Sequence, residues 1–198
     1  MHSLIHRSII QSHGGLTIEV QCFCSLSSIC PTCSRTQATD IFQSKHLDEV
    51  TGGKYWNLFD HFVVIDCRYK YEFNGGHING AISVQDSKLL ELLFSANICT
   101  NKRIAWIFHC EYSQKRGPRA TSFIRKLDRT YNKFSYPNTC FPHCYVLNGG
   151  CTHYFERDIN ECTYVSMFDE RFYADMMEHG KCDKALWANQ CFTEENFV

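Results

Sequence analysis

The sequence has almost no excess of charge and lacks a long hydrophobic run. Its 198 residues include 20 Lys and Arg against 21 Asp and Glu, for a formal net charge of −1. A chain so close to neutral has no global attraction to nucleic acid or to a membrane surface. No stretch approaches the roughly 18 consecutive apolar residues of a membrane span. We therefore expect a soluble protein that binds neither nucleic acid nor membranes and whose charged recognition comes from local clusters.

The amino-terminal stretch MHSLIHRSIIQSHGG also lacks the apolar run and the small-residue cleavage site of a secretory signal. Cysteine is abundant, with 13 residues, but a fully paired disulfide framework would hold an even number. Free thiols persist in reducing compartments. We therefore expect the protein in the nucleus, the cytoplasm or both.

Four of the cysteines lie in the short stretch CFCSLSSICPTC, which holds Cys22, Cys24, Cys30 and Cys33. Paired cysteines can present thiolates to a tetrahedral zinc ion. This spacing is cramped and matches no familiar zinc knuckle, so we favour incidental cysteines and expect neither a metal nor a cofactor.

The hydrophobic fraction of 44% is enough to build the core of one domain of ordinary size. We divide the chain into an amino-terminal extension that is poorly ordered or loosely packed, a catalytic domain and a short tail, at residues 1–37, 38–190 and 191–198.

Short apolar runs, rich in β-branched side chains, predict buried strands at 62–66, 104–108 and 144–150. Helical spacing of apolar residues predicts helices at 38–60, 86–97 and 118–131. Apolar strands that alternate with amphipathic helices predict an α/β fold, with a mostly parallel central sheet and helices on both faces. In such folds the working residues follow the carboxyl ends of strands.

The stretch FHCEYSQKRGPRA, residues 108–120, places Cys110 directly after a predicted strand and Arg116 six residues later. Pro118 suits the first turn of a helix, where its missing N–H does no harm. A loop that leads into a helix amino terminus presents backbone N–H groups to an anion, and the same field favours the thiolate form of cysteine. Arg116 can hold two phosphoryl oxygens in one planar fork. The pattern predicts nucleophilic attack on phosphorus and a phosphocysteine intermediate. The alternative is that Cys110 is an ordinary buried cysteine with chance neighbours.

Three blocks of the sequence resemble the M-phase inducer phosphatases. They are VIDCRYKYEFNGGHINGA at 64–81, FHCEYSQKRGPRATSFIRKLDR at 108–129 and YVLNGGCTHYF at 145–155. Residues 165–187 resemble the helical tail of that family more weakly. The resemblance implies a rhodanese-like fold and a metal-free, dual-specificity phosphatase. Such an enzyme removes phosphate from Thr and Tyr of a cyclin-dependent kinase–cyclin complex and promotes mitotic entry. We expect it to act as a monomer.

The resemblance also implies roles for single residues. Cys110 is the nucleophile, Arg116 binds phosphate, and Glu111 is a candidate catalytic group. The backbone of the loop, including Tyr112, Ser113, Gln114 and Lys115, cradles the phosphate. Cys67 matches a second cysteine that captures the oxidised nucleophile as a disulfide. Two cysteines at adjacent strand ends could approach closely, and a reactive thiolate is easily oxidised. A plain buried cysteine is the alternative.

Arg125 and Arg129 lie four residues apart, hence on one helical face. They match the kinase-docking arginines of the family, and Tyr136 matches a nearby docking position once two inserted residues are allowed. The segment 110–133 has seven basic and two acidic side chains, which suits an acidic protein partner. A solvated helix face is the alternative.

Lys115 departs from the family, in which a glutamate commonly precedes the loop arginine. The proton for the leaving oxygen then comes from Glu111, from a group on the kinase or from the phosphate itself. The lysine predicts tighter anion binding and slower departure of the leaving group. Among other residues of the blocks, we expect His77 to be structural, and Asp66 and Arg68 to support the loop.

Two other enzyme classes use this type of scaffold. A rhodanese sulfurtransferase has a loop one residue shorter, so the five residues between Cys110 and Arg116 argue against that class. Arsenate reductases share the longer loop and remain the alternative, although they lack the docking arginines and the tail. A binding module without catalysis would lack the cysteine or the arginine.

Overall fold

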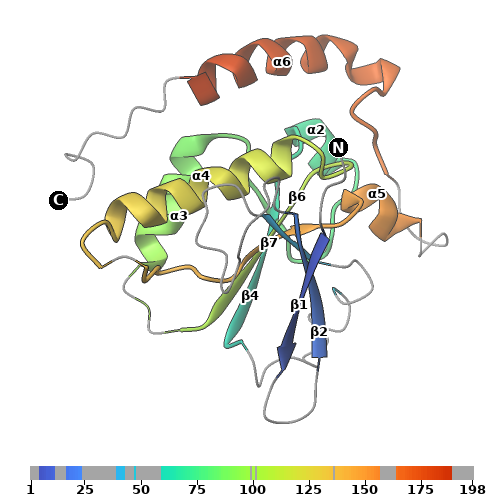
Figure 1. Cartoon of the computed structure of the whole chain (residues 1–198). Coiled ribbons are helices and arrows are strands. Elements are labelled where there is room, and N and C mark those ends of the chain that lie inside the picture. The colour runs from blue at the N-terminus through green and yellow to red at the C-terminus, as the bar shows by residue number, and fades with distance from the viewer. Residues whose placement is uncertain are drawn as a thin grey trace.

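The computed structural model of the chain (Figure 1) describes residues 5–11, 17–23, 39–42, 47, 59–98, 100, 102–135, 137–156 and 164–188. In that part of the chain, no helix is both long and apolar enough to cross a membrane.

The described strands form one sheet in the order β1-β2-β3-β7-β6-β4-β5. Their bounds are Ile5–Gln11 (β1), Thr17–Phe23 (β2), Thr39–Phe42 (β3), His61–Asp66 (β4), Ile82–Ser83 (β5), Ile104–His109 (β6) and Cys144–Leu147 (β7). From β3 to β5 every neighbouring pair is parallel, whereas β1 and β2 form an antiparallel hairpin that continues antiparallel onto β3. The predicted mostly parallel central sheet is confirmed.

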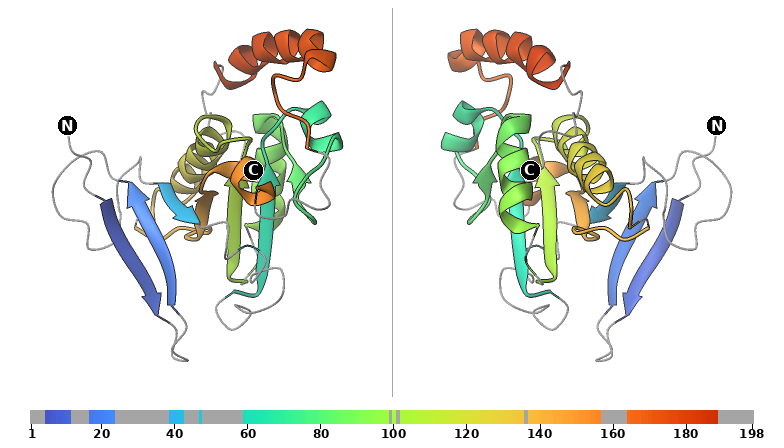
Figure 2. Two further views of the ribbon diagram at one scale, coloured as in Figure 1. Left: turned by 90° about the vertical axis from the view of Figure 1, so that its right-hand side faces the viewer. Right: turned by 90° about the vertical axis from the view of Figure 1, so that its left-hand side faces the viewer.

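Helices cover both faces of this sheet, as the views in Figure 2 show. Ser87–Asn97 (α3) and Arg116–Tyr131 (α4) lie on one face, and Gly150–Phe155 (α5) lies on the other. The remaining described helices are Lys70–Asn74 (α2) and Tyr173–Ala188 (α6), with a short 3-10 turn at Glu170–Phe172 (η2). Alternate side chains of a strand point to opposite faces. Accordingly, Trp106 and Phe108 of β6 join the core cluster of α3 and α4, whereas Ala105 and Ile107 join a second cluster that includes Cys151 of α5. All six residues of β6 are buried, so this central strand supports the site at its carboxyl end.

Most predicted elements of the domain are present, and one is wrong. The strands at 62–66 and 104–108 and the helices at 86–97 and 118–131 are confirmed as β4, β6, α3 and α4. The strand predicted over 144–150 is present as β7 but ends at Leu147, and Gly150 begins α5. The helix predicted over 38–60 is wrong at its start, because Thr39–Phe42 is β3 and pairs in parallel with β7. A short apolar run fits a strand or a helix equally well. Here the segment forms a strand because its backbone can hydrogen-bond to the edge of β7.

The amino-terminal region contains two strands, β1 and β2, that were not predicted from the sequence. β1 and β2 extend the sheet beyond β3. Cys22 lies in β2, while Cys24, Cys30 and Cys33 lie outside the described residues. The domain boundaries at 37/38 and 190/191 stay a prediction.

Candidate active site

Cys110 directly follows β6, and the loop after it ends at Arg116, the first residue of α4. The predicted order of strand, loop and helix is therefore confirmed. Cys110 is only 4% exposed and belongs to the core cluster of α3 and α4. Tyr112, Gln114 and Lys115 are exposed on the loop. Gly117 packs its Cα closely against the backbone of His109, since an added Cβ there would lie 3.2 Å from the carbonyl carbon.

The amino end of α5 determines how the peptide groups of this loop point. The backbone N–H of Cys151 donates to the carbonyl of Cys110 at 3.1 Å, and the backbone N–H of Thr152 donates to the carbonyl of Glu111 at 3.1 Å. The hydroxyl of Thr152 donates to the same Glu111 carbonyl at 2.9 Å. In a trans peptide the N–H points opposite to the C=O. The amides that follow these two carbonyls therefore point away from α5.

Gly150 and Ser113 supply backbone shapes that this loop needs. Gly150 has φ +65°, and an added Cβ would lie 2.3 Å from the Glu111 carbonyl oxygen and 2.4 Å from that of Cys110. Ser113 has φ 53°, in the left-handed region. Left-handed residues within a turn gather successive N–H groups into an anion-binding concavity. The Ser113 hydroxyl is buried and has no hydrogen-bond partner in the structure, so it is available to bind a ligand.

Glu72 of α2 holds the guanidinium of Arg116. Both terminal nitrogens of Arg116 donate to the Glu72 carboxylate, one of them at 3.0 Å, and Glu72 is fully buried. The backbone N–H of Tyr69 donates to Glu72 at 2.9 Å and fixes its orientation. Burial raises the pKa of Glu72, although Arg116 offsets part of that rise. Because an arginine has five N–H donors, the pair leaves donors of Arg116 for an anion.

A buried ionic group lies behind the loop. Arg68 donates from Nε and Nη2 to the carboxylate of Asp66 and from Nη2 to the Gly76 carbonyl at 2.7 Å. Burial opposes ionisation of Asp66, but His109 and Arg68 favour it, and the pKa of Asp66 is below its ordinary value. Burial lowers the pKa of His109, whose Nε2 lies 3.8 Å from Asp66. Asp66 and Arg68 thus lie where we expected them, as supports beneath the end of β6.

Cys67 and Cys110 follow residues that face each other in the sheet. Asp66 pairs with His109 in the register of β4 and β6, and the backbone N–H of Cys67 donates to the His109 carbonyl at 2.8 Å. Burial raises the pKa of the Cys67 thiol, and the neighbouring Cys110 adds to the rise. The two cysteines are therefore neighbours, as predicted from their strand ends, while their redox pairing stays a prediction.

Glu111 faces the carboxyl-terminal part of the chain. Its carboxylate is buried and accepts hydrogen bonds from Tyr164 and Ser166. The predicted catalytic group therefore has its hydrogen-bond partners in the segment that follows α5.

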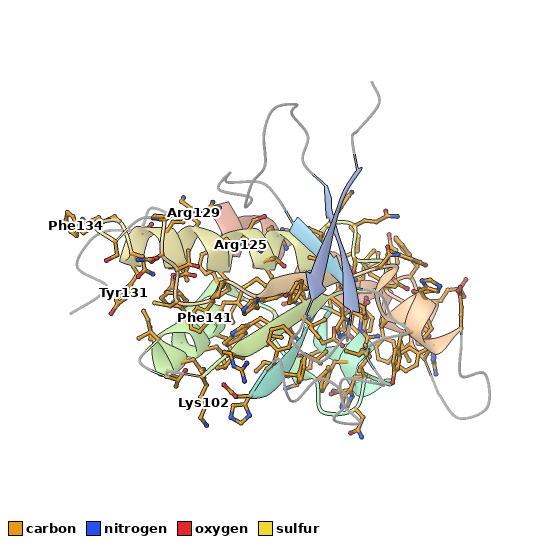
Figure 3. All side chains as sticks on the ribbon, turned by 60° about the horizontal axis from the view of Figure 1, so that its bottom comes forward. Lys102, Arg125, Arg129, Tyr131, Phe134 and Phe141 are labelled. Carbon is orange, nitrogen blue, oxygen red and sulfur yellow. The ribbon has the colours of Figure 1, made fainter. Side chains whose placement is uncertain are left out.

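The predicted docking arginines, Arg125 and Arg129, lie one turn apart on α4 (Figure 3). Arg125 donates to the Cys144 carbonyl at 2.9 Å and is half-buried, as is Arg129. Asp128, between them in sequence, accepts from the backbone N–H groups of Cys140 and Phe141 at 2.7 and 2.9 Å. It therefore ties the end of α4 to the loop before β7. Tyr136 lies outside the described residues.

His77 is exposed, stacks on Phe73 at 3.8 Å between ring centroids and lies 3.0 Å, through Nδ1, from the Phe73 carbonyl oxygen. These contacts fit the structural role expected for it. Within the described ranges, no group of three or more His, Cys, Asp or Glu is arranged to hold a metal ion.

A family model for the rhodanese-like domain matches residues 53–157, which is more than half of the chain. The chain belongs to the rhodanese-like family. The matched range of this rhodanese-like domain runs from the approach to β4 to just beyond α5, and it includes Cys67, Glu72, Cys110 and Arg116.

Known relatives of this rhodanese-like domain include M-phase inducer phosphatases. M-phase inducer phosphatase 1 of Bos taurus is 37% identical over 150 residues, which cover 73% of this chain and 28% of that protein. M-phase inducer phosphatase of Emericella nidulans is 40% identical over 124 residues, which cover 61% of this chain and 22% of that protein. The chain spans about a quarter of the length of these curated relatives. The resemblance predicted from the sequence is confirmed.

Among solved structures, a yeast protein tyrosine phosphatase of the rhodanese family is similar to this chain. It is 24% identical, with a TM-score of 0.47, and the match covers 59% of this chain and 83% of that one.

Sequence reasoning missed four side chains of this rhodanese-like site: Glu72, Tyr69, Tyr164 and Ser166. Glu72 and Tyr69 do lie inside the block at 64–81 that carries the resemblance. Glu72 bonds to Arg116 across 44 residues, and Tyr164 and Ser166 bond to Glu111 across 53 and 55. The ring of Tyr69 lies against the same Arg116. No spacing rule connects residues so far apart.

Proposed function

We propose that the chain is a dual-specificity protein phosphatase that removes phosphate from Thr and Tyr of a cyclin-dependent kinase and thereby promotes mitotic entry. The observation that carries the proposal is the shape of the loop from Cys110 to Arg116. Its first two carbonyls are held by α5, so the amides that follow them point away from α5, and its arginine begins a helix. The identity with M-phase inducer phosphatases over most of the domain supports the same function.

The first step is an attack of the Cys110 thiolate on phosphorus. A bond forms between Sγ and phosphorus, and the bond from phosphorus to the Thr or Tyr oxygen breaks. Negative charge develops on the phosphoryl oxygens, where the loop amides, the positive end of the α4 dipole and Arg116 offset it. The orphaned hydroxyl of Ser113 can donate to the same group.

The leaving oxygen must gain a proton in this step. Glu111 is turned toward Tyr164 and Ser166 and is 1% exposed, so its geometry does not favour a transfer to substrate. A phosphate monoanion, or a group on the kinase, supplies the proton instead. In the second step water attacks phosphorus and the bond to Sγ breaks. Cys110 leaves as the thiolate, and both protons of the water remain on the released phosphate.

Glu72 prepares Arg116 for both steps. A guanidinium held by two hydrogen bonds loses little conformational freedom when it binds phosphate, so its binding energy is available in the transition state. The ring of Tyr69, 4.7 Å from the Arg116 guanidinium carbon, restricts the side chain from a second side.

The kinase is bound away from the loop, along the carboxyl-terminal half of α4. Arg125 and Arg129 face the same side of that helix, and Phe134, which is 91% exposed, lies beyond its end (Figure 3). Basic side chains beside an exposed aromatic ring suit an acidic protein surface with an apolar spot.

The deciding experiment compares three substrates for the purified full chain: a doubly phosphorylated kinase–cyclin complex, a small aryl phosphate and arsenate with a thiol reductant. We expect hydrolysis of the first two and none with Cys110→Ser. Robust arsenate reduction without hydrolysis of the kinase phosphates would overturn the proposal.

The docking surface is tested separately with Arg129→Ala. Because this residue is remote from the loop, kcat/KM should fall on the kinase complex by about tenfold or more, while kcat/KM on the aryl phosphate stays unchanged. Lys102→Ala, which removes an exposed cation before β6 and outside α4, is the matched control. Equal losses on both substrates would contradict docking.

A further inference from the structure

The carboxylate of Glu111 connects the loop with the segment that follows α5. One oxygen, Oε1, accepts three hydrogen bonds: from the Tyr164 hydroxyl at 2.5 Å, the Ser166 hydroxyl at 2.7 Å and the Met167 backbone N–H at 3.3 Å. The residue is 1% exposed, so these bonds form away from water. Hydrogen bonds to a charged acceptor are about twice as strong as those between neutral groups.

Glu111 is thus held at both its backbone and its side chain. Its carbonyl accepts from the N–H and the hydroxyl of Thr152, while its carboxylate is held by residues 164–167. It is also the residue next to Cys110. Because both the backbone and the side chain of Glu111 are held, the peptide group between Cys110 and Glu111 has one orientation. The N–H of this peptide group is the first amide of the phosphate loop.

The same segment makes a second attachment, near the loop arginine. The hydroxyl of Tyr71 donates to the Met167 carbonyl at 2.7 Å, and the ring of Phe172 stacks on Tyr71 at 4.9 Å between centroids. Farther along, His179 of α6 stacks on Tyr69 at 5.0 Å. Tyr69 is the ring that lies against Arg116.

The views in Figures 1 and 2 agree with these contacts. α6 runs across the end of the domain where α2 and the start of α4 lie, rather than along a face of the sheet. The part of the chain from Tyr164 to α6 therefore lies at the mouth of the proposed phosphate site.

We infer that Glu111 is a positioning residue, and that Tyr164 and Ser166 form with it a latch that holds the phosphate loop in its anion-binding shape. The inference rests on the proposed function and deepens it. The carboxyl-terminal segment is part of the active site because it orders the loop before the anion arrives. When the latch is broken, the anion must itself order the loop as it binds. Part of its binding free energy is spent on that ordering, so anion affinity falls.

The test measures tungstate affinity by calorimetry, because this oxyanion occupies a phosphate site without turnover. The full chain is compared with Ser166→Ala, Ser166→Asp and Ser166→Thr. We expect roughly tenfold weaker binding for Ser166→Ala, which loses one hydrogen bond to a charged group. Ser166→Asp should lose more, because its carboxylate faces that of Glu111. Ser166→Thr keeps the hydroxyl and should bind nearly as the unchanged chain does.

Two controls separate the latch from general destabilisation. Ser95→Ala removes an exposed hydroxyl from α3 and should leave tungstate affinity unchanged. Urea unfolding of each variant identifies conditions in which all chains are folded, so that a loss of affinity there reports the loop alone. Tyr164→Phe removes the second hydroxyl donor and should weaken binding in the same way.

The outcomes are distinct for the two proposals. If the unchanged chain binds tungstate and the variants Ser166→Ala, Ser166→Asp and Tyr164→Phe bind it equally well, the latch is overturned and the proposed function stands. If the unchanged chain binds no tungstate, the proposed function fails and the latch fails with it. Graded losses, with recovery in Ser166→Thr, support the latch.

Discussion

The guanidinium of Arg116 lies against the fully buried carboxylate of Glu72, with both terminal nitrogens donating to it. The two residues are 44 positions apart in the chain and come from the starts of different helices. Breaking one partner of a buried pair leaves the other charge uncompensated, which costs more than the pair contributes. The arginine of the loop therefore depends on a residue outside the loop.

Glu72→Gln should weaken that hold, because an amide cannot accept two charge-assisted hydrogen bonds. We expect tungstate affinity and kcat/KM on an aryl phosphate each to fall by about tenfold or more. Calorimetry and steady-state kinetics measure the two effects. Glu91→Gln on α3, which touches neither the loop nor Arg116, is the matched control, and an equal loss in this variant would argue against a specific role.

Gly150→Ala should disrupt the loop most severely among single substitutions of glycine. The new Cβ would meet the carbonyl oxygens of Glu111 and Cys110 at 2.3 and 2.4 Å, in addition to strain at φ +65°. Gly80→Ala is the control for strain alone, since Gly80 has φ +76° but nothing lies within 4 Å of an added Cβ. We expect Gly80→Ala to lose stability by about 1 kcal/mol and to keep tungstate binding, and Gly150→Ala to lose that binding. Similar binding by both variants would contradict the close contact.

Cys67 should capture Cys110 after mild oxidation. Hydrogen peroxide converts the reactive thiolate to a sulfenic acid, and the thiol of Cys67 then forms a disulfide with release of water. Mass spectrometry of a non-reduced digest should find the linked peptides, and dithiothreitol should restore activity. In Cys67→Ser we expect irreversible loss at the same dose. Cys140→Ser serves as the control, and if it lost recoverability to the same extent, the pairing would be wrong.

Acid should destabilise the fold through His109. Burial lowers the pKa of this histidine, so the folded chain holds it neutral while the unfolded chain binds a proton below a pH of about 6.5. The contribution of His109 to the free energy of unfolding is therefore fully present above that pH. It declines as the pH falls further, by at most about 1.4 kcal/mol per pH unit.

Urea unfolding at pH 7.5, 6.5 and 5.5 measures this decline. His143, whose pKa burial also lowers, acts in the same direction. His143→Gln should therefore remove the contribution of His143 to the pH dependence and keep the contribution of His109. A stability that rises between pH 6.5 and 5.5 would contradict the assignment.

Much of the secondary structure of the domain could be predicted from the sequence, because the residues that determine each element are contiguous in the chain. β6, the loop from Cys110 to Arg116 and α4 are consecutive. Each has a local cause, respectively the buried apolar run, the Cys-x5-Arg spacing and the Gly-Pro pair in the first turn of the helix. Local causes failed for Thr39–Phe42, where the apolar spacing suited a helix and the pairing with β7 made a strand.

The sequence by itself thus determined the position of Cys110, which we propose as the nucleophile, the arginine that ends its loop and the α/β order around them. It could do so because backbone preferences and burial patterns act within one stretch of chain. Only the tertiary structure decided what holds that loop. Glu72 reaches Arg116 across 44 residues, and Ser166 reaches Glu111 across 55. Such pairs form because folding removes both groups from water together. A buried charge without a hydrogen-bonded partner is unfavourable, and only the packing of distant segments brings that partner close.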